Sequence, residues 1–287
     1  MSETRLSLIT SAADRLAGAG IEDARRTAEW MLEDVLGLSR TGLVAGLHEP
    51  VSGTAAGAFE ALVARRLARE PVQYVLGHAD FFGLRLYVSP AVLIPRPETE
   101  ELVEDVLRRL AFTDHPWVLD VGTGSGAIAL AVKHQRPDAE VFACDVSEAA
   151  LAVARDNAER LGLDVTFCHA DALTPAFADG VPATFHAVVS NPPYVPAAEA
   201  PTLEPEVRDF EPSAALFVPD ADPLVFYRAL AGHAPRLLRP GGHLVCETHA
   251  DYGSAVRDLF AEAGLCKATI RRDLAGRERI AAGVWPG

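Results

Sequence analysis

The sequence predicts an α/β fold: a Rossmann-like, doubly wound sheet of seven strands, preceded by a small helical domain. From Trp117 onward, short apolar runs alternate with stretches of helical periodicity, which is typical of a parallel sheet with helices on both faces. Residues 1–70 show helical periodicity alone. We therefore expect an N-terminal helical domain at residues 1–72, a β-hairpin linker at 73–97 and a sheet domain at 98–287.

Length and composition restrict the class of protein. The chain has 287 residues, of which 49% are apolar, so it can bury a sizeable core. No apolar run reaches 18 residues, and the first residues lack the basic and apolar regions of a signal peptide. The formal net charge of −14 disfavours bulk duplex DNA as a partner, although a local basic patch remains compatible with it.

The cysteines and histidines predict no metal site. The nine histidines lack metal-ligand spacing, and the cysteines form no C-x-x-C pair. All four cysteines fall in predicted strands, so we expect buried free thiols in a reducing cytoplasm rather than disulfides. These cysteines are Cys144, Cys168, Cys246 and Cys266.

The helical domain is predicted from three apolar stripes. They begin at Leu6, Ala24 and Phe59, with glycines after the first and a capping Ser52 or Thr54 before the third. Short helices of this kind bury little surface alone, so we expect a small bundle. The bundle is either a structural cap or a module that recognises the substrate, and the sequence leaves both open.

A bridge from Glu70 to Pro97 precedes the sheet domain. Pro71 ends the helical pattern, and two alternating runs around Gly83 predict a β-hairpin. Arg96 then stands between two prolines just before a helix that begins near Glu98. It is either a plain surface residue or one that orients an active-site loop, and we weigh these equally.

Within the sheet domain, we expect seven strands separated by helices. The predicted helices cover residues 98–107, 127–133, 149–161, 224–238 and 250–263. The predicted strands cover residues 117–121, 141–145, 165–169, 185–190, 243–248, 266–272 and 279–284. The segment 195–222 lacks periodicity, and a loop of this length favours a substrate-covering role.

A glycine-rich turn and an acidic residue predict an adenosine-containing cofactor. The turn is Gly122-Thr123-Gly124-Ser125-Gly126, and Asp145 ends the second strand about twenty residues later. Ala127 stands where a P-loop requires lysine, and the G-x-G-x-G spacing departs from the dinucleotide fingerprint. A methyltransferase turn fits the spacing and the preceding Asp120.

The fourth strand ends at Asn191-Pro192-Pro193-Tyr194. The prolines stop the strand, which leaves a stiff loop at the edge of the sheet where ligands bind. Asn191 Oδ1 and the Pro192 carbonyl can accept two N–H bonds from a planar nitrogen, and Tyr194 can pack against it. A tight turn with a buried tyrosine is the plainer interpretation of this motif alone.

Four arginines lie in the closing hairpin, and they predict either a solvated sheet edge guarded by charge or a patch for an RNA-bound or acidic partner. They are Arg271, Arg272, Arg277 and Arg279.

Together, the glycine turn and the Asn191–Tyr194 motif resemble class I S-adenosylmethionine-dependent methyltransferases that act on a planar nitrogen. Ile94-Pro95-Arg96-Pro97-Glu98-Thr99-Glu100 and Phe210-Glu211-Pro212 extend the resemblance to the PrmC/HemK family, over essentially the whole chain. The resemblance implies methylation of the glutamine amide in the Gly-Gly-Gln motif of class 1 peptide release factors, by a cytoplasmic monomer without direct DNA or membrane binding.

The resemblance also implies roles for particular residues. Asn191 and Pro192 would be catalytic, and they would bind substrate together with Pro193 and Tyr194. The cofactor would contact residues 122–126, the ribose carboxylate Asp145, and Asn191, with Asp171 and Ala172 at the adenine. Ala172 departs from family members that place an aromatic side chain there, which puts stacking by that position in doubt.

Two alternatives to this function remain. The same chemistry could serve a ribosomal-protein glutamine or a nucleic-acid adenine. The chain could instead be a catalytically silent S-adenosylmethionine-binding interaction module, although the intact Asn191–Tyr194 motif argues against that.

Overall fold

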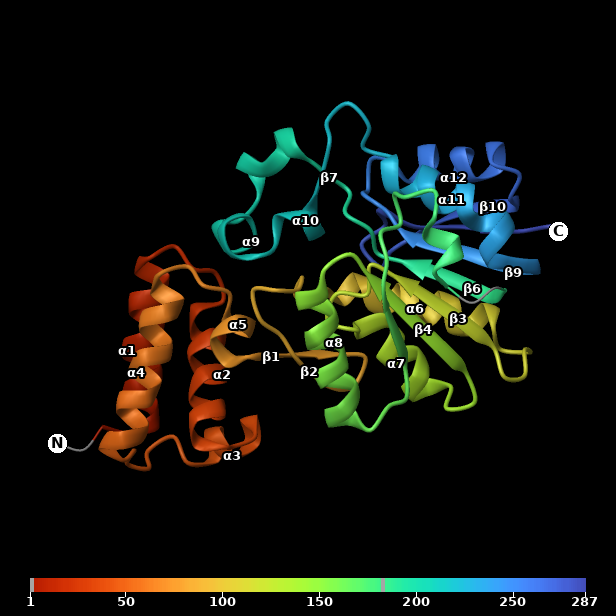
Figure 1. The fold of residues 1–287 in the computed structure, drawn as a ribbon. Helices are drawn as coiled ribbons and strands as arrows, with labels where there is room; N and C mark the ends of the chain where they lie inside the picture. Colours follow the sequence, from red (N-terminus) through yellow and green to blue (C-terminus); the bar gives the residue numbers. More distant parts are fainter. Residues whose placement is uncertain (1–2, 182–183) are drawn as a thin grey trace. The chain divides into compact units, whose positions relative to one another are not determined.

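The computed structural model describes residues 3–181 and 184–287 and separates the chain into two compact units. The helical unit comprises Met1–His78 with Glu204–Phe210, and the sheet unit comprises Ala79–Leu203 with Glu211–Gly287 (Figure 1). Residues 1–2 of the predicted helical domain lie outside the described residues.

The helical unit is a bundle whose helices bury apolar stripes such as Ile9, Met31 and Phe59. Ser52 is the N-cap of α4, where its hydroxyl accepts from the Ala55 N–H. The expectation that Pro71 ends the helical pattern was wrong, because this proline is the N-cap of the short helix α5. The helices are α1 (Arg5–Gly18), α2 (Ala24–Leu36), α3 (Arg40–Ala45), α4 (Gly53–Leu67), α5 (Val72–Leu76) and α9 (Pro205–Phe210).

Helix α9 belongs to the segment that follows the Asn191–Tyr194 motif, yet it packs in the helical unit. Glu206 accepts from the Arg66 and Arg69 guanidinium groups, at 2.7 Å in each case. Burial alone would raise the pKa of Glu206, but these two cations hold it below its ordinary value. The segment 195–222 is therefore more structured than the sequence indicated, with short elements β7 (Val195–Pro196), η2 (Ala197–Thr202), α10 (Ser213–Leu216) and β8 (Phe217–Val218).

The sheet unit contains the seven-stranded sheet that the sequence predicted, in the order β10-β11-β9-β6-β3-β4-β5. Strand β3 pairs in parallel with β4 and β6, whereas β11 is antiparallel to both neighbours. The strands are β3 (Trp117–Val121), β4 (Glu140–Asp145), β5 (Thr166–His169), β6 (Phe185–Ser190), β9 (Leu238–Glu247), β10 (Cys266–Arg272) and β11 (Glu278–Val284).

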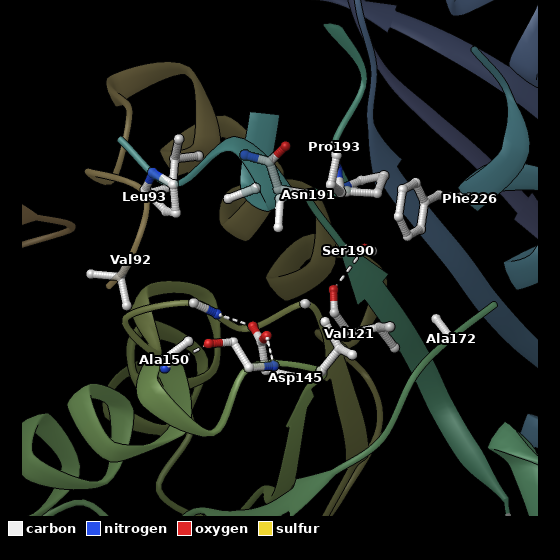
Figure 2. A pocket seen from close by; sticks show the side chains of 18 of the residues that line it. Val92, Leu93, Val121, Asp145, Ala150, Ala172, Ser190, Asn191, Pro193 and Phe226 are labelled. Atoms are coloured by element: carbon white, nitrogen blue, oxygen red, sulfur yellow. Dashed lines mark hydrogen bonds between the residues drawn. The ribbon is translucent and has the colours of Figure 1, made fainter. Parts of the chain in front are cut away.

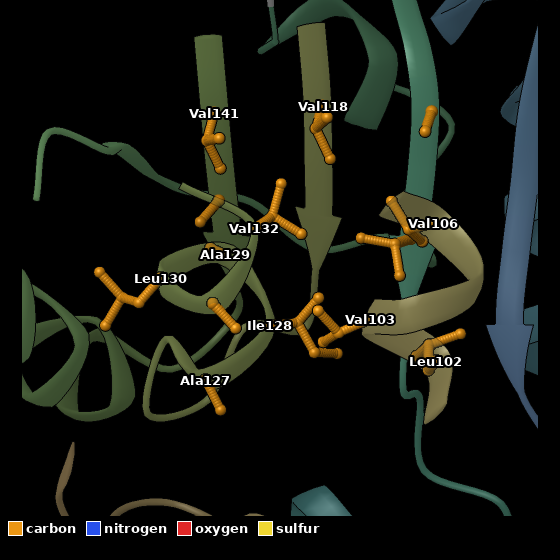
Figure 3. Close-up of a cluster of buried hydrophobic side chains, with 14 of the residues drawn as sticks. Leu102, Val103, Val106, Val118, Ala127, Ile128, Ala129, Leu130, Val132 and Val141 are labelled. Atoms are coloured by element: carbon orange, nitrogen blue, oxygen red, sulfur yellow. The ribbon is translucent and has the colours of Figure 1, made fainter. Parts of the chain in front are cut away.

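Helices flank this sheet, and successive residues of one strand face opposite cores. Val118 joins a core with Val103 and Ile128, whereas Leu119 joins a second core with Tyr227 (Figure 3). The helices are α6 (Pro97–Arg109), α7 (Ala127–Gln135), α8 (Glu148–Leu161), η1 (Phe177–Asp179), α11 (Val225–Leu237) and α12 (Gly253–Glu262). The predicted hairpin, β1 (His78–Phe81) with β2 (Leu84–Tyr87), contributes Phe81 and Leu86 to the first core.

Two local expectations were wrong. The strand predicted at residues 243–248 begins earlier, because β9 starts at Leu238 and runs through residues 240–242, where Gly241 N–H donates to the Trp285 carbonyl and Trp285 N–H donates to the Gly242 carbonyl. Cys266 is exposed rather than buried, because it lies on the edge strand β10. Among the residues that the structure describes, no helix is long and apolar enough to cross a membrane.

Candidate functional site

A pocket of the sheet unit opens where strands β3, β4 and β6 end (Figure 2). Its empty volume is about 910 Å³, counted out to the open mouth. Since the carboxyl ends of parallel strands meet at this edge, residues that are far apart in the sequence line one cavity.

The glycine turn forms the floor of this pocket through its backbone. Gly122 and Gly124 line the cavity with φ of 74° and 56°, a region that side chains with a Cβ rarely adopt. Thr123, Ser125 and Gly126 are not among the lining residues. A Cβ on Gly126 would lie only 3.0 Å from Leu130 Cδ1, so this glycine permits close packing of the turn against its own helix.

Two acidic residues lie beside the turn. Asp145 accepts the Gly124 N–H and the Ser147 N–H at its two oxygens, both at 2.9 Å. Each carboxylate oxygen has a further lone pair that a ligand hydroxyl can use. Asp171 Oδ1 accepts the Leu173 N–H at 2.8 Å, and both Asp171 and Ala172 line the pocket. The structure thus brings Asp145, Asp171 and Ala172 to one cavity.

Asp120 lies fully buried behind the turn. Its Oδ2 accepts the Thr123 hydroxyl at 2.6 Å and the Ala129 N–H at 3.2 Å, whereas its Oδ1 has no hydrogen-bond partner among the described residues. Burial raises the pKa of Asp120 to about 7, although the two hydrogen bonds oppose that rise. A buried acceptor without a partner at the glycine turn favours a cationic or hydrogen-bonding ligand group nearby.

Replacing Asp120 should change how stability depends on pH. A carboxyl whose folded pKa is raised from 3.8 to about 7 binds its proton more tightly when folded. Its stabilising contribution is therefore present below pH 4 and is lost as pH rises through about 7, by at most about 4 kcal/mol. We expect the Asp120→Asn variant to lack this loss. Urea unfolding of both proteins between pH 4 and 8 measures it, and parallel curves would contradict the assignment.

The Asn191–Tyr194 motif stands at the pocket's upper wall. Asn191, Pro192 and Pro193 line the cavity, and the preceding Ser190 hydroxyl anchors the loop by donating to the Val121 carbonyl at 2.7 Å. Tyr194 is not a lining residue: its hydroxyl donates to Glu247 Oε1 at 3.1 Å. Burial raises the pKa of Tyr194 well above its ordinary value, so this hydroxyl stays protonated.

Two further segments complete the cavity, and an ion pair joins them. Arg96 Nη2 lies 2.5 Å from Glu211 Oε1, and Glu211 Oε2 accepts the Ile94 N–H at 3.1 Å. The flanking residues 91–93, 212, 214 and 215 contribute to the lining. Of the two interpretations of Arg96, the structure favours the one in which it orients an active-site loop.

Sequence reasoning missed several lining residues. Phe226, from helix α11, points into the cavity beside Pro193 on the side of Ala172 (Figure 2). Its helix has ordinary amphipathic periodicity, so no sequence signal separates Phe226 from a core residue. The other lining residues that the sequence did not indicate include Val121, Val146, Ala150, Ser190 and Leu230.

The arginines of the closing hairpin are paired with acids of the sheet unit. Arg271 donates to the Glu101 carbonyl, and Arg279 is buried against Asp273 at 3.2 Å. Arg272 lies 3.5 Å from Glu278, and Arg277 lies 3.5 Å from Glu98. This pairing favours a charged structural edge over a free basic patch. Within residues 3–181 and 184–287, no three metal-ligating side chains cluster.

Comparison with known proteins agrees with this geometry. The family described as PrmC N-terminal domain matches residues 7–77, and the one described as Methyltransferase small domain matches residues 100–204. A release factor glutamine methyltransferase of Geobacter sulfurreducens is 42% identical over 93% of this chain and 92% of its own. One from Moorella thermoacetica is 45% identical over 92% and 93%.

A solved structure shows the same fold. The 16S rRNA N2 G1207 methyltransferase of T. thermophilus, in complex with AdoMet and guanosine, matches with a TM-score of 0.52 at 21% identity. The match covers 72% of this chain and 49% of that one. Since the identity to full-length relatives exceeds 40% over nine tenths of the sequence, this chain belongs to the family of release factor glutamine methyltransferases.

Proposed function

We propose that this protein transfers a methyl group from S-adenosylmethionine to the side-chain amide nitrogen of the glutamine in the Gly-Gly-Gln motif of class 1 release factors. The observation that carries the proposal is the position of Asn191 and Pro192 on the wall of a pocket floored by a glycine turn. The relatives' names supply the substrate class. We further propose that the protein acts in the cytoplasm and that residues 1–72 recognise the release factor.

The pocket residues fit the cofactor in three respects. The exposed backbone at Gly122 and Gly124 suits the methionine part, which carries no phosphate, and the buried Asp120 Oδ1 lacks a partner near that turn. Asp145 keeps lone pairs for two ribose hydroxyls. Asp171 and Ala172 lie where they can contact the adenine.

The chemistry requires positioning more than a strong base. When bound, S-adenosylmethionine supplies an electrophilic methyl group. Asn191 Oδ1 and the Pro192 carbonyl would accept both N–H bonds of the glutamine amide, which fixes a weak nucleophile and opposes delocalisation of its lone pair. The nitrogen would form a bond to the methyl carbon as the bond from that carbon to the sulfonium sulfur breaks, which leaves a neutral thioether, and one N–H proton would pass to water.

Phe226 should contribute to cofactor binding, because it supplies an aromatic surface on the side of the pocket where Ala172 provides none. Full burial of a phenyl side chain contributes about 1.5–3 kcal/mol, and the half-buried Phe226 ring would gain part of this when the cofactor covers it. We expect Phe226→Ala to weaken S-adenosylmethionine binding about tenfold or more in calorimetry. Phe112→Ala, which removes a fully exposed ring, is the control and should leave the affinity unchanged. Equal affinities for both variants would contradict this role.

The function is tested by transfer of labelled methyl to purified release factors. The controls are a release factor with the Gly-Gly-Gln glutamine replaced, a ribosomal protein and DNA. Label on that glutamine supports the proposal. Label only on ribosomal protein or DNA would keep the chemistry and reject the substrate, and cofactor binding without any transfer would favour an interaction module.

A further inference from the structure

The Asn191 side chain is the first member of a buried hydrogen-bond chain. Asn191 Nδ2 donates to Thr99 Oγ1 at 3.1 Å, and Thr99 Oγ1 donates to Glu247 Oε2 at 2.7 Å. Thr99 and Glu247 are only 4% and 1% exposed. The three residues come from the loop after β6, the first turn of α6 and the end of β9.

The chemistry of Glu247 sets the direction of this chain. Thr99 has a single hydroxyl proton, and it donates that proton to Glu247 Oε2 at 2.7 Å. The oxygen of Thr99 therefore has only lone pairs left for Asn191, and only the NH₂ end of the amide can satisfy them. The opposite rotation would place the amide oxygen against the Thr99 oxygen with no proton between them.

Glu247 is itself held from several sides. Its Oε1 accepts the Tyr194 hydroxyl at 3.1 Å. The Tyr227 hydroxyl donates to the main-chain carbonyl of Glu247, at 3.0 Å, rather than to the carboxylate. Burial raises the pKa of Glu247, whereas the Thr99 hydrogen bond and the charge of Arg279 oppose the rise. Tyr194 donates to Oε1 and Thr99 donates to Oε2, so the Glu247 carboxylate cannot rotate away from the Thr99 hydroxyl without losing both hydrogen bonds.

We propose that Thr99 and Glu247 are positioning residues that fix the rotation of the Asn191 amide so that Oδ1 faces the substrate nitrogen. No hydrogen bond among the described residues uses this oxygen, and Asn191 lines the pocket. The inference deepens the proposed function and rests on it. The side-chain nitrogen of the substrate glutamine carries two N–H donors. A reversed Asn191 would turn its own NH₂ group toward them, and two donors cannot form a hydrogen bond with each other.

Thr99→Val tests the role, because it removes the hydroxyl and keeps the shape of the side chain. We expect kcat for release-factor methylation to fall about 10- to 100-fold, with the affinity for S-adenosylmethionine within twofold of the parent. Thr99→Ser restores the hydroxyl and should recover most of kcat. Thr99→Ala removes the same group if the valine variant does not fold.

Glu247→Met should have a similar effect, because it frees the Thr99 proton to turn toward Asn191. The double variant should lose no more than the more affected single variant, since the two residues act through one contact. Tyr227→Phe is the matched control: it removes a buried hydrogen bond to the main chain of Glu247 without touching the side-chain network, and kcat should stay within about threefold of the parent.

A readout without substrate separates this inference from the proposed function. In ¹⁵N spectra of the parent and of Thr99→Ser, the Asn191 side-chain NH₂ protons should have chemical shifts away from those of a free amide and should exchange slowly with water. In Thr99→Val, their chemical shifts and exchange rates should return to those of a free amide. If the parent enzyme leaves the release factor unmethylated, the proposed function is rejected. The spectra require no substrate, so they still test the rotation of the Asn191 amide. Unchanged spectra, or unchanged kcat in Thr99→Val, would overturn the inference.

Discussion

Asn191→Ala should lower methyl transfer by about 100- to 1,000-fold, the largest effect of any single substitution that we expect. The variant removes one of the two acceptors that we propose for the glutamine N–H bonds, and loss of one preorganised hydrogen-bonding group at a reacting centre has this magnitude. The cofactor contacts that we propose for the glycine turn and Asp145 would remain in place. Cofactor affinity should therefore stay within a few-fold of the parent, which calorimetry measures beside single-turnover kinetics.

Asn191→Asp tests the same position without shortening the side chain. It keeps the size of the side chain but places a charged acceptor against the Thr99 oxygen, which has no proton to offer. We expect it to be nearly as inactive as Asn191→Ala. A variant at this position that retains most of its single-turnover rate would exclude Asn191 from the role proposed for it.

Arg96→Ala should weaken cofactor binding about 10- to 100-fold. The Glu211 side chain is 1% exposed, so removing its ion-pair partner leaves a buried charge that costs about 3–5 kcal/mol. The carboxylate must then gain a proton or move toward water. In either case residues 91–93, 212, 214 and 215, which line the pocket, lose their fixed positions.

The two ends of this ion pair should respond unequally. Arg96 is 30% exposed and can be hydrated, so Glu211→Gln, which still accepts the Ile94 N–H, should lower the affinity less than Arg96→Ala. Arg228→Ala removes an exposed ion pair with Asp222 and should have no measurable effect. A larger loss in Glu211→Gln than in Arg96→Ala would show that burial of the carboxylate is not the cause.

The fold class, the seven strands and the edge of the sheet where the pocket lies are predictable from local patterns in the sequence. These follow from local patterns: apolar runs give strands, prolines after Ser190 stop one of them, and parallel strands bring Gly122, Asp145 and Asn191 to one edge. Hydrophobic periodicity and turn chemistry act over a few residues, so they can be recognised without a structure.

Only the tertiary structure decided which side chains meet. Thr99 and Asn191 are 92 residues apart, and Glu211 reaches Arg96 over 115 residues, so no local pattern could pair them. The same holds for Phe226, whose helix places it in the pocket, and for Tyr194, whose hydroxyl donates to Glu247 instead of lining the cavity. Hydrogen-bond direction and burial depend on these long-range contacts, because a buried polar group takes whichever partner the packed chain brings to it.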